Sequence, residues 1–319
     1  MTSLLSRHAE SIYWMARYVE RAENLARLLD VNETFSRNAL GDQNWAAVLE
    51  IFDDGELFAK LRGAPTNEAV IHFYTLDAEN PNSIQWQLNA VRENARALRP
   101  LISTEMWTQI NTFHGRVSGK RRGDVTEAKL SNFCAMVKEG CQLHTGITEG
   151  TFVRDEAWYI YEAGRALERA DQTTRLLDVK YHLLLPSEAD VGSRLDVSQW
   201  NALLRSAAGY HAFRRTHPHG MTPALVAAFM LFDRYFARSV RACMVRLVQM
   251  LDEMEAAYGI APTPETHRRL RALIQTLENE SIDEVVGQGL HEFLDDIQDE
   301  LIRVSDEFAL SFFPEPVPD

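Results

Sequence analysis

Two adjacent glutamate–arginine pairs are the residues in this chain whose types and spacing best suit chemistry. Glu20-Arg21 and Glu168-Arg169 lie 148 positions apart, and a further arginine stands three positions before each glutamate. Guanidinium groups present forked donors that match carboxylates and phosphates. The two glutamates could also be assembled as an acid–base pair, but a neighbouring arginine would hold each one ionised rather than poised near neutral pH. The pattern therefore favours binding or structure over proton transfer.

The element that must position these pairs is a long helix that occurs twice. Residues 12–31, IYWMARYVERAENLARLLDV, return at 160–179 as IYEAGRALERADQTTRLLDV, and eleven of the twenty aligned pairs are identical. Random pairing would give about one identity. Both copies lack proline, and apolar residues recur at steps of three and four, which predicts two helices. The predicted apolar face of the first copy consists of Ile12, Met15, Val19, Ala22, Ala26 and Leu29.

The opposite face of the repeated helix changed less than the apolar one. Three of the six apolar positions differ between the copies, whereas six of seven positions on the other face are identical. One interpretation is a solvated surface with weak ion pairs between successive turns. However, a solvated surface tolerates substitution, so we expect the two faces to meet each other or a shared interior pocket. Glu20 would then pair with Arg169, and Glu168 with Arg21, around an approximate two-fold axis.

This expectation defines one set of candidate binding residues and leaves their role open. Either the charges clamp the fold, with the arginines taken up by the glutamates and helix carbonyls, or they grip an anionic ligand. Persistence of buried pairs points to specificity or a ligand, since desolvation offsets much of their Coulomb gain. The set comprises Tyr13, Arg17, Glu20, Arg21, Tyr161, Arg165, Glu168 and Arg169.

Composition narrows the class of protein. The net charge is −13, and thirteen acidic residues against the single basic Arg303 concentrate it in residues 276–319. With no basic surplus, nucleic-acid binding is not expected. No run of 18 apolar residues and no secretory signal are present, so we expect neither membrane insertion nor export. Three scattered cysteines fit a reducing cytoplasm.

Known catalytic and cofactor motifs are missing from the sequence. It contains no GxGxxG, Walker lysine loop, HExxH, GxSxG or Cys-x-x-Cys, and neither copy of the repeat has the Glu-x-x-His of di-iron bundles. His211, His217 and His219 lie in residues 210–220, an expected loop between two helices, whose His-Pro-His at 217–219 is more typical of a turn than of a metal site. The basic tripeptide 120–122 is expected in a solvated loop. We therefore predict no catalytic residue, no metal and no cofactor.

The whole chain is predicted to be all-α. No segment shows period-two alternation or hairpin turns, and helical periodicity recurs throughout. We expect a single domain, residues 1–319, built as a multi-helix bundle with related halves at about 1–148 and 149–319. Residues 289–308 predict an amphipathic acidic helix. Its outer face is either simply solvated or a docking surface for a basic partner.

Several motifs together resemble the Alpha-E family, bacterial helical proteins with a Glu-Arg motif. LLSR at 4–7 with YWMARYVERAE at 13–23 is similar to the start of that family, and GRALERAD at 164–171 is similar to its second Glu-Arg motif. RENAR at 92–96, EMW at 105–107 and RSV at 238–240 also fit. Ala237 departs from the pattern, because a proline is expected there. The resemblance covers essentially the whole chain.

What the resemblance implies is a partner rather than a reaction. Alpha-E proteins are usually encoded beside, or fused to, an ATP-grasp-like protein and a transglutaminase-like protein, which suggests ATP-dependent amide-bond formation or peptide modification. Two hypotheses follow. The chain is a non-catalytic partner of an ATP-grasp amide ligase, or it is an enzyme or substrate-binding subunit with an arginine-lined anion or peptide pocket between the two Glu-Arg helices.

Overall fold

The computed structural model describes residues 4–38, 45–184 and 194–313. Helices make up most of these residues. No strand occurs in these ranges, so the all-α prediction is confirmed. The first half contains α1 (Ser6–Asn38), α2 (Ala46–Ile51), α3 (Gly55–Arg62), α4 (Asn67–Thr75), α5 (Ile84–Ala97), α6 (Thr104–Ser118) and α7 (Leu130–Thr151), with 3-10 turns at Arg122–Asp124 and Glu127–Lys129. The second half contains α8 (Glu156–Leu184), α9 (Arg194–Ser206), α10 (Tyr210–Thr216), α11 (Pro223–Phe232), α12 (Val240–Tyr258), α13 (Pro264–Asn279), α14 (Ile282–Gln288) and α15 (Leu290–Phe312).

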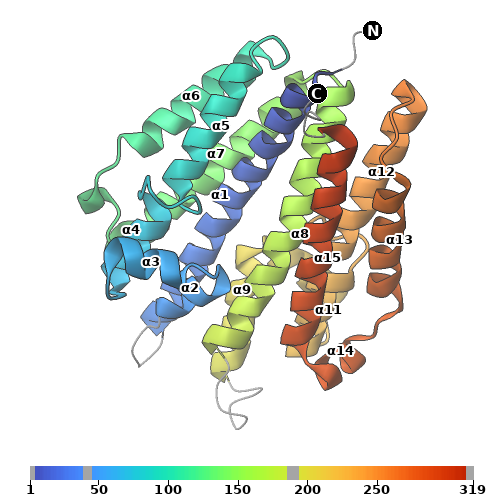
Figure 1. Cartoon of the computed structure of the whole chain (residues 1–319). Helices are drawn as coiled ribbons and strands as arrows, with labels where there is room; N and C mark the ends of the chain where they lie inside the picture. Colours follow the sequence, from blue (N-terminus) through green and yellow to red (C-terminus); the bar gives the residue numbers. More distant parts are fainter. Residues whose placement is uncertain (1–3, 39–44, 185–193, 314–319) are drawn as a thin grey trace.

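The two copies of the repeated helix, α1 and α8, pack against each other along the middle of the molecule (Figure 1). On one side α1 packs against α5 and α7, and on the other α8 packs against α12 and α15. The copies therefore have neighbours in a corresponding order along the chain. The approximate two-fold relation between the halves stays a prediction.

Small residues allow α1 and α8 to approach closely. A Cβ atom added to Gly164 would lie 2.7 Å from the backbone oxygen of Tyr13, which is closer than real Cβ contacts come. The corresponding position in the first copy is Ala16, which is also buried. Glycine at 164 is thus required by the helix crossing rather than by a turn.

Serine and threonine side chains cap the helices that flank this central pair. Ser83 accepts the backbone N–H of Trp86 at the start of α5, and Ser239 accepts that of Ala242 at the start of α12. Each satisfies a backbone donor that the first helical turn leaves free. The caps fix where α5 and α12 begin beside α1 and α8.

Both faces of the central helices are buried. The predicted apolar face of α1 is in the core, but so are Glu20, Asn24 and Arg27 on the opposite face. The interpretation of this face as a solvated surface is therefore wrong. The ion pairs of the repeat are therefore interior features, formed both within one helix and between helices.

Two segments differ from the expected elements. Residues 210–220, expected as a loop, begin with the short helix α10, because Phe213 is completely buried and anchors it to the core. The helix α14 was not expected either, although Ser281 and Glu284 form a capping box at its start. None of the described helices is long and apolar enough to cross a membrane.

Candidate functional site

Glu168 on α8 is the acceptor of one charged cluster between the central helices. Arg21 on α1 donates from Nε and Nη2 to its two carboxylate oxygens at 2.6 and 2.9 Å. Arg17 adds a bond from Nε at 2.8 Å, and Gln172 one from Nε2 at 3.0 Å. The Glu168 side chain is 0% exposed. Within the described part of the chain, its hydrogen bonds come from the two copies of the repeat.

Glu20 on α1 is the acceptor of the second cluster. Arg169 on α8 donates from Nε and Nη2 to its two oxygens at 2.9 and 2.7 Å. Arg238, in the turn before α12, donates from Nη1 at 2.9 Å, and Asn24 donates from its amide at 3.0 Å. The predicted reciprocal pairs, Glu20 with Arg169 and Glu168 with Arg21, are thereby confirmed.

These contacts determine the ionisation of both glutamates. Burial by itself raises the pKa of a carboxyl group, but Arg21 and Arg17 outweigh it and lower the pKa of Glu168 well below its usual range. For Glu20 the opposing charges are Arg169 and Arg238, with the same outcome. Carboxylates with so low a pKa are ionised near neutral pH and have no proton to give as general acids there.

A further carboxylate and arginine extend each cluster by one helical turn. Arg27 binds Glu23 through Nε at 3.0 Å and donates from Nη1 to the carbonyl of Ser206 on α9 at 2.7 Å. In the second copy, Arg175 binds Asp171 at 2.9 Å and the carbonyl of Ile51 on α2 at 3.2 Å. The extended clusters thus tie α1 to α9 and α8 to α2.

Three members of the candidate set make no hydrogen bond to Glu20 or Glu168. Arg165 does not reach Glu20; it binds Glu162 at 2.7 Å, one turn back on α8. The Tyr13 hydroxyl lies 2.8 Å from Ser305 on α15 and accepts a bond from Arg17. Tyr161 is buried beside Phe152 and His144. Both tyrosines serve the packing of α1 and α8 against neighbouring helices.

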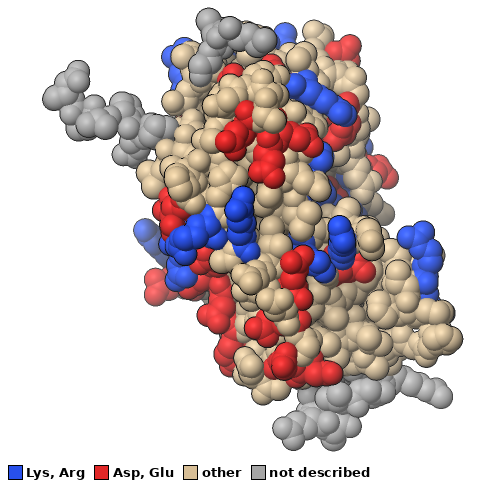
Figure 2. Space-filling model, turned by 90° about the vertical axis from the view of Figure 1, so that its right-hand side faces the viewer, with Lys and Arg blue, Asp and Glu red and all other residues tan. Residues whose placement is uncertain are grey.

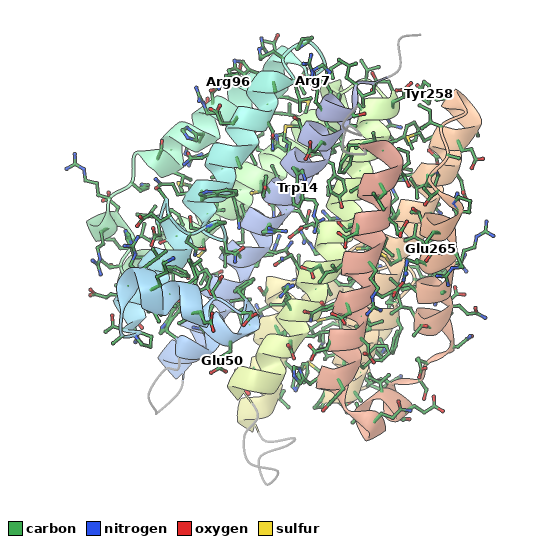
Figure 3. All side chains as sticks on the ribbon, in the orientation of Figure 1. Arg7, Trp14, Glu50, Arg96, Tyr258 and Glu265 are labelled. Carbon is green, nitrogen blue, oxygen red and sulfur yellow. The ribbon has the colours of Figure 1, made fainter. Side chains whose placement is uncertain are left out.

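Arginine-lined cavities lie in two places, between the two Glu-Arg helices and beside α8 alone. Between α1 and α8, two small cavities of about 200 and 150 Å³ lie beside the ion pairs, the first lined by Arg17 and the second by Arg21 and Arg175. Trp14, labelled in Figure 3, lines the first of these together with residues of α8 and α15. A larger pocket of about 390 Å³ opens between α8 and α12, and its lining includes Arg165 and Arg169.

Three further features of the described residues could do chemistry outside the two clusters. Burial raises the pKa of Cys243 to about 11, so this side chain is a thiol at neutral pH. Burial also lowers the pKa of His144 to about 4, which keeps it neutral. Asp178, His291 and Asp295 are close enough together to hold a metal ion, but Asp178 and Asp295 already form ion pairs with His291 at 2.9 and 3.5 Å.

Sequence reasoning missed two residues that complete these sites. Arg238 joins the Glu20 cluster from a turn 218 residues away, and its only signal was the family-like Arg-Ser-Val segment. Glu162 occupies the place of Trp14 in the repeat, and this difference between copies was its signal. Positions that are identical in the two copies predicted the charged clusters, whereas Glu162, which differs from Trp14, lines the pocket between α8 and α12.

Comparison with known proteins places this geometry in a family context. The model of the Alpha-E family, described as a predicted alpha-helical domain with a conserved ER motif, matches residues 4–313. An uncharacterized protein of Mycobacterium bovis is 24% identical over 299 residues, covering 88% of this chain and 33% of that protein. Two uncharacterized proteins of Mycobacterium tuberculosis are 24% and 23% identical with the same coverage. The chain therefore spans about a third of the length of these relatives. No solved structure matches.

Proposed function

We propose that this chain, which belongs to the Alpha-E family, is a non-catalytic helical partner of an ATP-grasp-type amide ligase in peptide synthesis or modification. The reciprocal pairing of Glu20 with Arg169 and of Glu168 with Arg21 carries the proposal. The glutamates and arginines of the Glu-Arg motif form ion pairs with one another inside the fold. Their role is to join the two central helices, which leaves the chemistry to a partner.

The relatives support the partnership. In the mycobacterial proteins the matching region makes up about a third of the chain, so there it works beside other parts of the same polypeptide. For the present chain we propose that an ATP-grasp-like protein, together with a transglutaminase-like protein, supplies the corresponding parts.

The exposed face of α15 is the proposed docking surface. Leu294, Ile297, Leu301 and Val304 bury one side of this helix against the core. Its outer side carries the exposed acids Glu292, Asp295, Asp296, Asp299 and Asp306, which lie within about 100° around the helix axis. On the face of the molecule that Figure 2 shows, acidic and basic side chains lie in small neighbouring groups among largely uncharged surface. An acidic helix face would steer a basic partner surface.

Copurification tests this function. The chain and the ATP-grasp-like protein encoded beside it are expressed together, and a tag on this chain is used for capture at low salt. We expect the ligase to be retained, and the triple substitution of Asp296, Asp299 and Asp306 by asparagine to reduce retention at least about tenfold. The matched control replaces the exposed Asp252, Glu253 and Glu255 of α12 with their amides, and should leave retention unchanged. Absence of any complex with the wild-type chain would refute the partnership.

A second function is favoured by a specific observation, the open pocket between α8 and α12. Arg165, Arg169, Arg234 and Arg246 all line it. This pocket supports a substrate-binding role for the subunit. It differs from the predicted site in lying beside one Glu-Arg helix rather than between the two.

A further inference from the structure

The pocket between α8 and α12 has the size and lining of a small-molecule site. Its volume of about 390 Å³ lies within the range of about 300–1,000 Å³ that ligand pockets occupy. Ala166, Ala242 and Val245 form an apolar part of the wall, and Tyr235, at 87% exposure, stands among the lining residues. The charged lining consists of Glu162, Arg165, Arg169, Arg234 and Arg246.

Comparison of the two copies of the repeat shows how the pocket arises. In α1, Trp14 lies 4.9 Å from the guanidinium carbon of Arg17, and Tyr18 lies 5.9 Å from that of Arg21. Tyr18 also contacts Trp86 of α5, so aromatic rings occupy this side of α1.

The second copy has lost these rings. Glu162 stands in place of Trp14 and Ala166 in place of Tyr18, while both arginines are kept. Removal of two large aromatic side chains leaves Arg165 and Arg169 beside open space. On this side of the helix the copies thus differ in the two residues that fill or open the space, while the Glu-Arg pair and the preceding arginine are the same.

Positive charge exceeds negative charge in the pocket. Arg169 is neutralised by Glu20 and Arg165 by Glu162, at 2.7 Å in each case. Arg246 has its nearest carboxylate, Glu162, at 3.7 Å. Arg234 makes no ion pair within the described part of the chain and lies only over the ring of Tyr235. Arg234 is thus without an ion pair among the described residues and Arg246 shares Glu162 with Arg165, so both retain donors for an anion, for which guanidinium forks are suited.

Glu162 adds a carboxylate to the arginine-lined pocket. Its side chain is only 2% exposed, and while Oε2 accepts the bond from Arg165, Oε1 has no hydrogen-bond partner among the described residues. A buried carboxylate oxygen without a donor is costly, so a ligand that supplies a donor would be favoured. An ammonium group is the donor that best complements a carboxylate.

We infer that this pocket binds a small zwitterion, an amino acid or short peptide, with the carboxylate on Arg234 and Arg246 and the amino group on the Glu162 carboxylate. The alanine and valine wall suits small aliphatic side chains. The inference stands on the pocket itself and goes beyond the partner role, so either can fail without the other. Carboxylate and amine are also the two groups that an amide ligase joins.

Titration calorimetry of the purified chain with L-alanyl-L-alanine tests the inference. We expect saturable one-to-one binding, weakened at least about tenfold when either end of the dipeptide is capped, since each cap removes a charge-assisted hydrogen bond. Inorganic phosphate should bind more weakly than the dipeptide. Equal affinity for the dipeptide and for phosphate, no effect of the caps, or no binding at all would each overturn the zwitterion assignment.

Three variants connect the binding to this pocket. Arg246→Gln should weaken binding about tenfold or more. Ala166→Tyr restores the residue of the first copy and should block the site without changing any charge. Arg215→Gln removes a charge from an exposed position outside the pocket and should bind like the wild type. Unchanged binding in a folded Ala166→Tyr protein would overturn the location.

Discussion

Replacing Glu168 with glutamine removes one negative charge from the interior while nearly preserving the shape of the side chain. Glu168 accepts four hydrogen bonds, three of them from the guanidiniums of Arg17 and Arg21. A glutamine side chain can accept hydrogen bonds only at its amide oxygen. Its NH2 group is a donor and would face the donors of these arginines. Two largely buried cations, 12% and 22% exposed, would be left without their common counter-ion.

The expected cost is large for a single substitution. Removing one partner of a buried ion pair typically costs about 3–5 kcal/mol, because the other charge stays buried without compensation. For a chain of this size that corresponds to a fall in Tm of roughly 5–10 °C.

Scanning calorimetry at neutral pH is the assay. The control, Glu79→Gln, removes a carboxylate that pairs with Arg62 at 3.0 Å but is 65% exposed. It should cost less than about 1 kcal/mol. A Glu168→Gln protein that melts within about 1 °C of the wild type would show that the cluster does not clamp the fold.

Two further predictions concern the same pair of helices. Gly164→Ala should destabilise the protein by about 1–3 kcal/mol, because the new Cβ meets the Tyr13 backbone. Gly146→Ala in α7, with open space around it, should instead raise the Tm. Equal effects of the two substitutions in thermal melts would contradict the close crossing of α1 and α8. Glu168 has its pKa lowered from 4.5 to about 2, so its contribution to stability is complete above about pH 4.5 and is lost as pH falls toward 2. The Tm of the wild type should therefore fall more steeply than that of Glu168→Gln across this interval, and parallel curves would refute the depressed pKa.

The reciprocal ion pairs could be predicted because the two copies of the repeated helix can be compared with each other within one sequence. Identities on one face of a duplicated helix mark positions with fixed partners, and the symmetric choice of partners follows from the duplication. The sequence could not show that Arg238 would share Glu20 with Arg169. That contact comes from a turn far along the chain, where no helical periodicity applies.

The pocket was harder to predict for a different reason. It depends on the volume that Trp14 and Tyr18 fill in one copy and that Glu162 and Ala166 leave empty in the other. A cavity is a property of packing between α8 and α12, and only the structure places α12 beside the residues that changed. The short helix α10 escaped prediction similarly, since burial of Phe213 rather than local sequence stabilises it.

The most direct test of the clamp is a double-mutant cycle between Glu168 and Arg21, with Glu168→Gln, Arg21→Gln and the double variant compared by thermal unfolding. The structure predicts that the second substitution costs much less in the presence of the first, with a coupling energy of at least about 1.5 kcal/mol. Additive effects within about 0.5 kcal/mol would contradict the account, because they would mean that the two charges do not depend on each other.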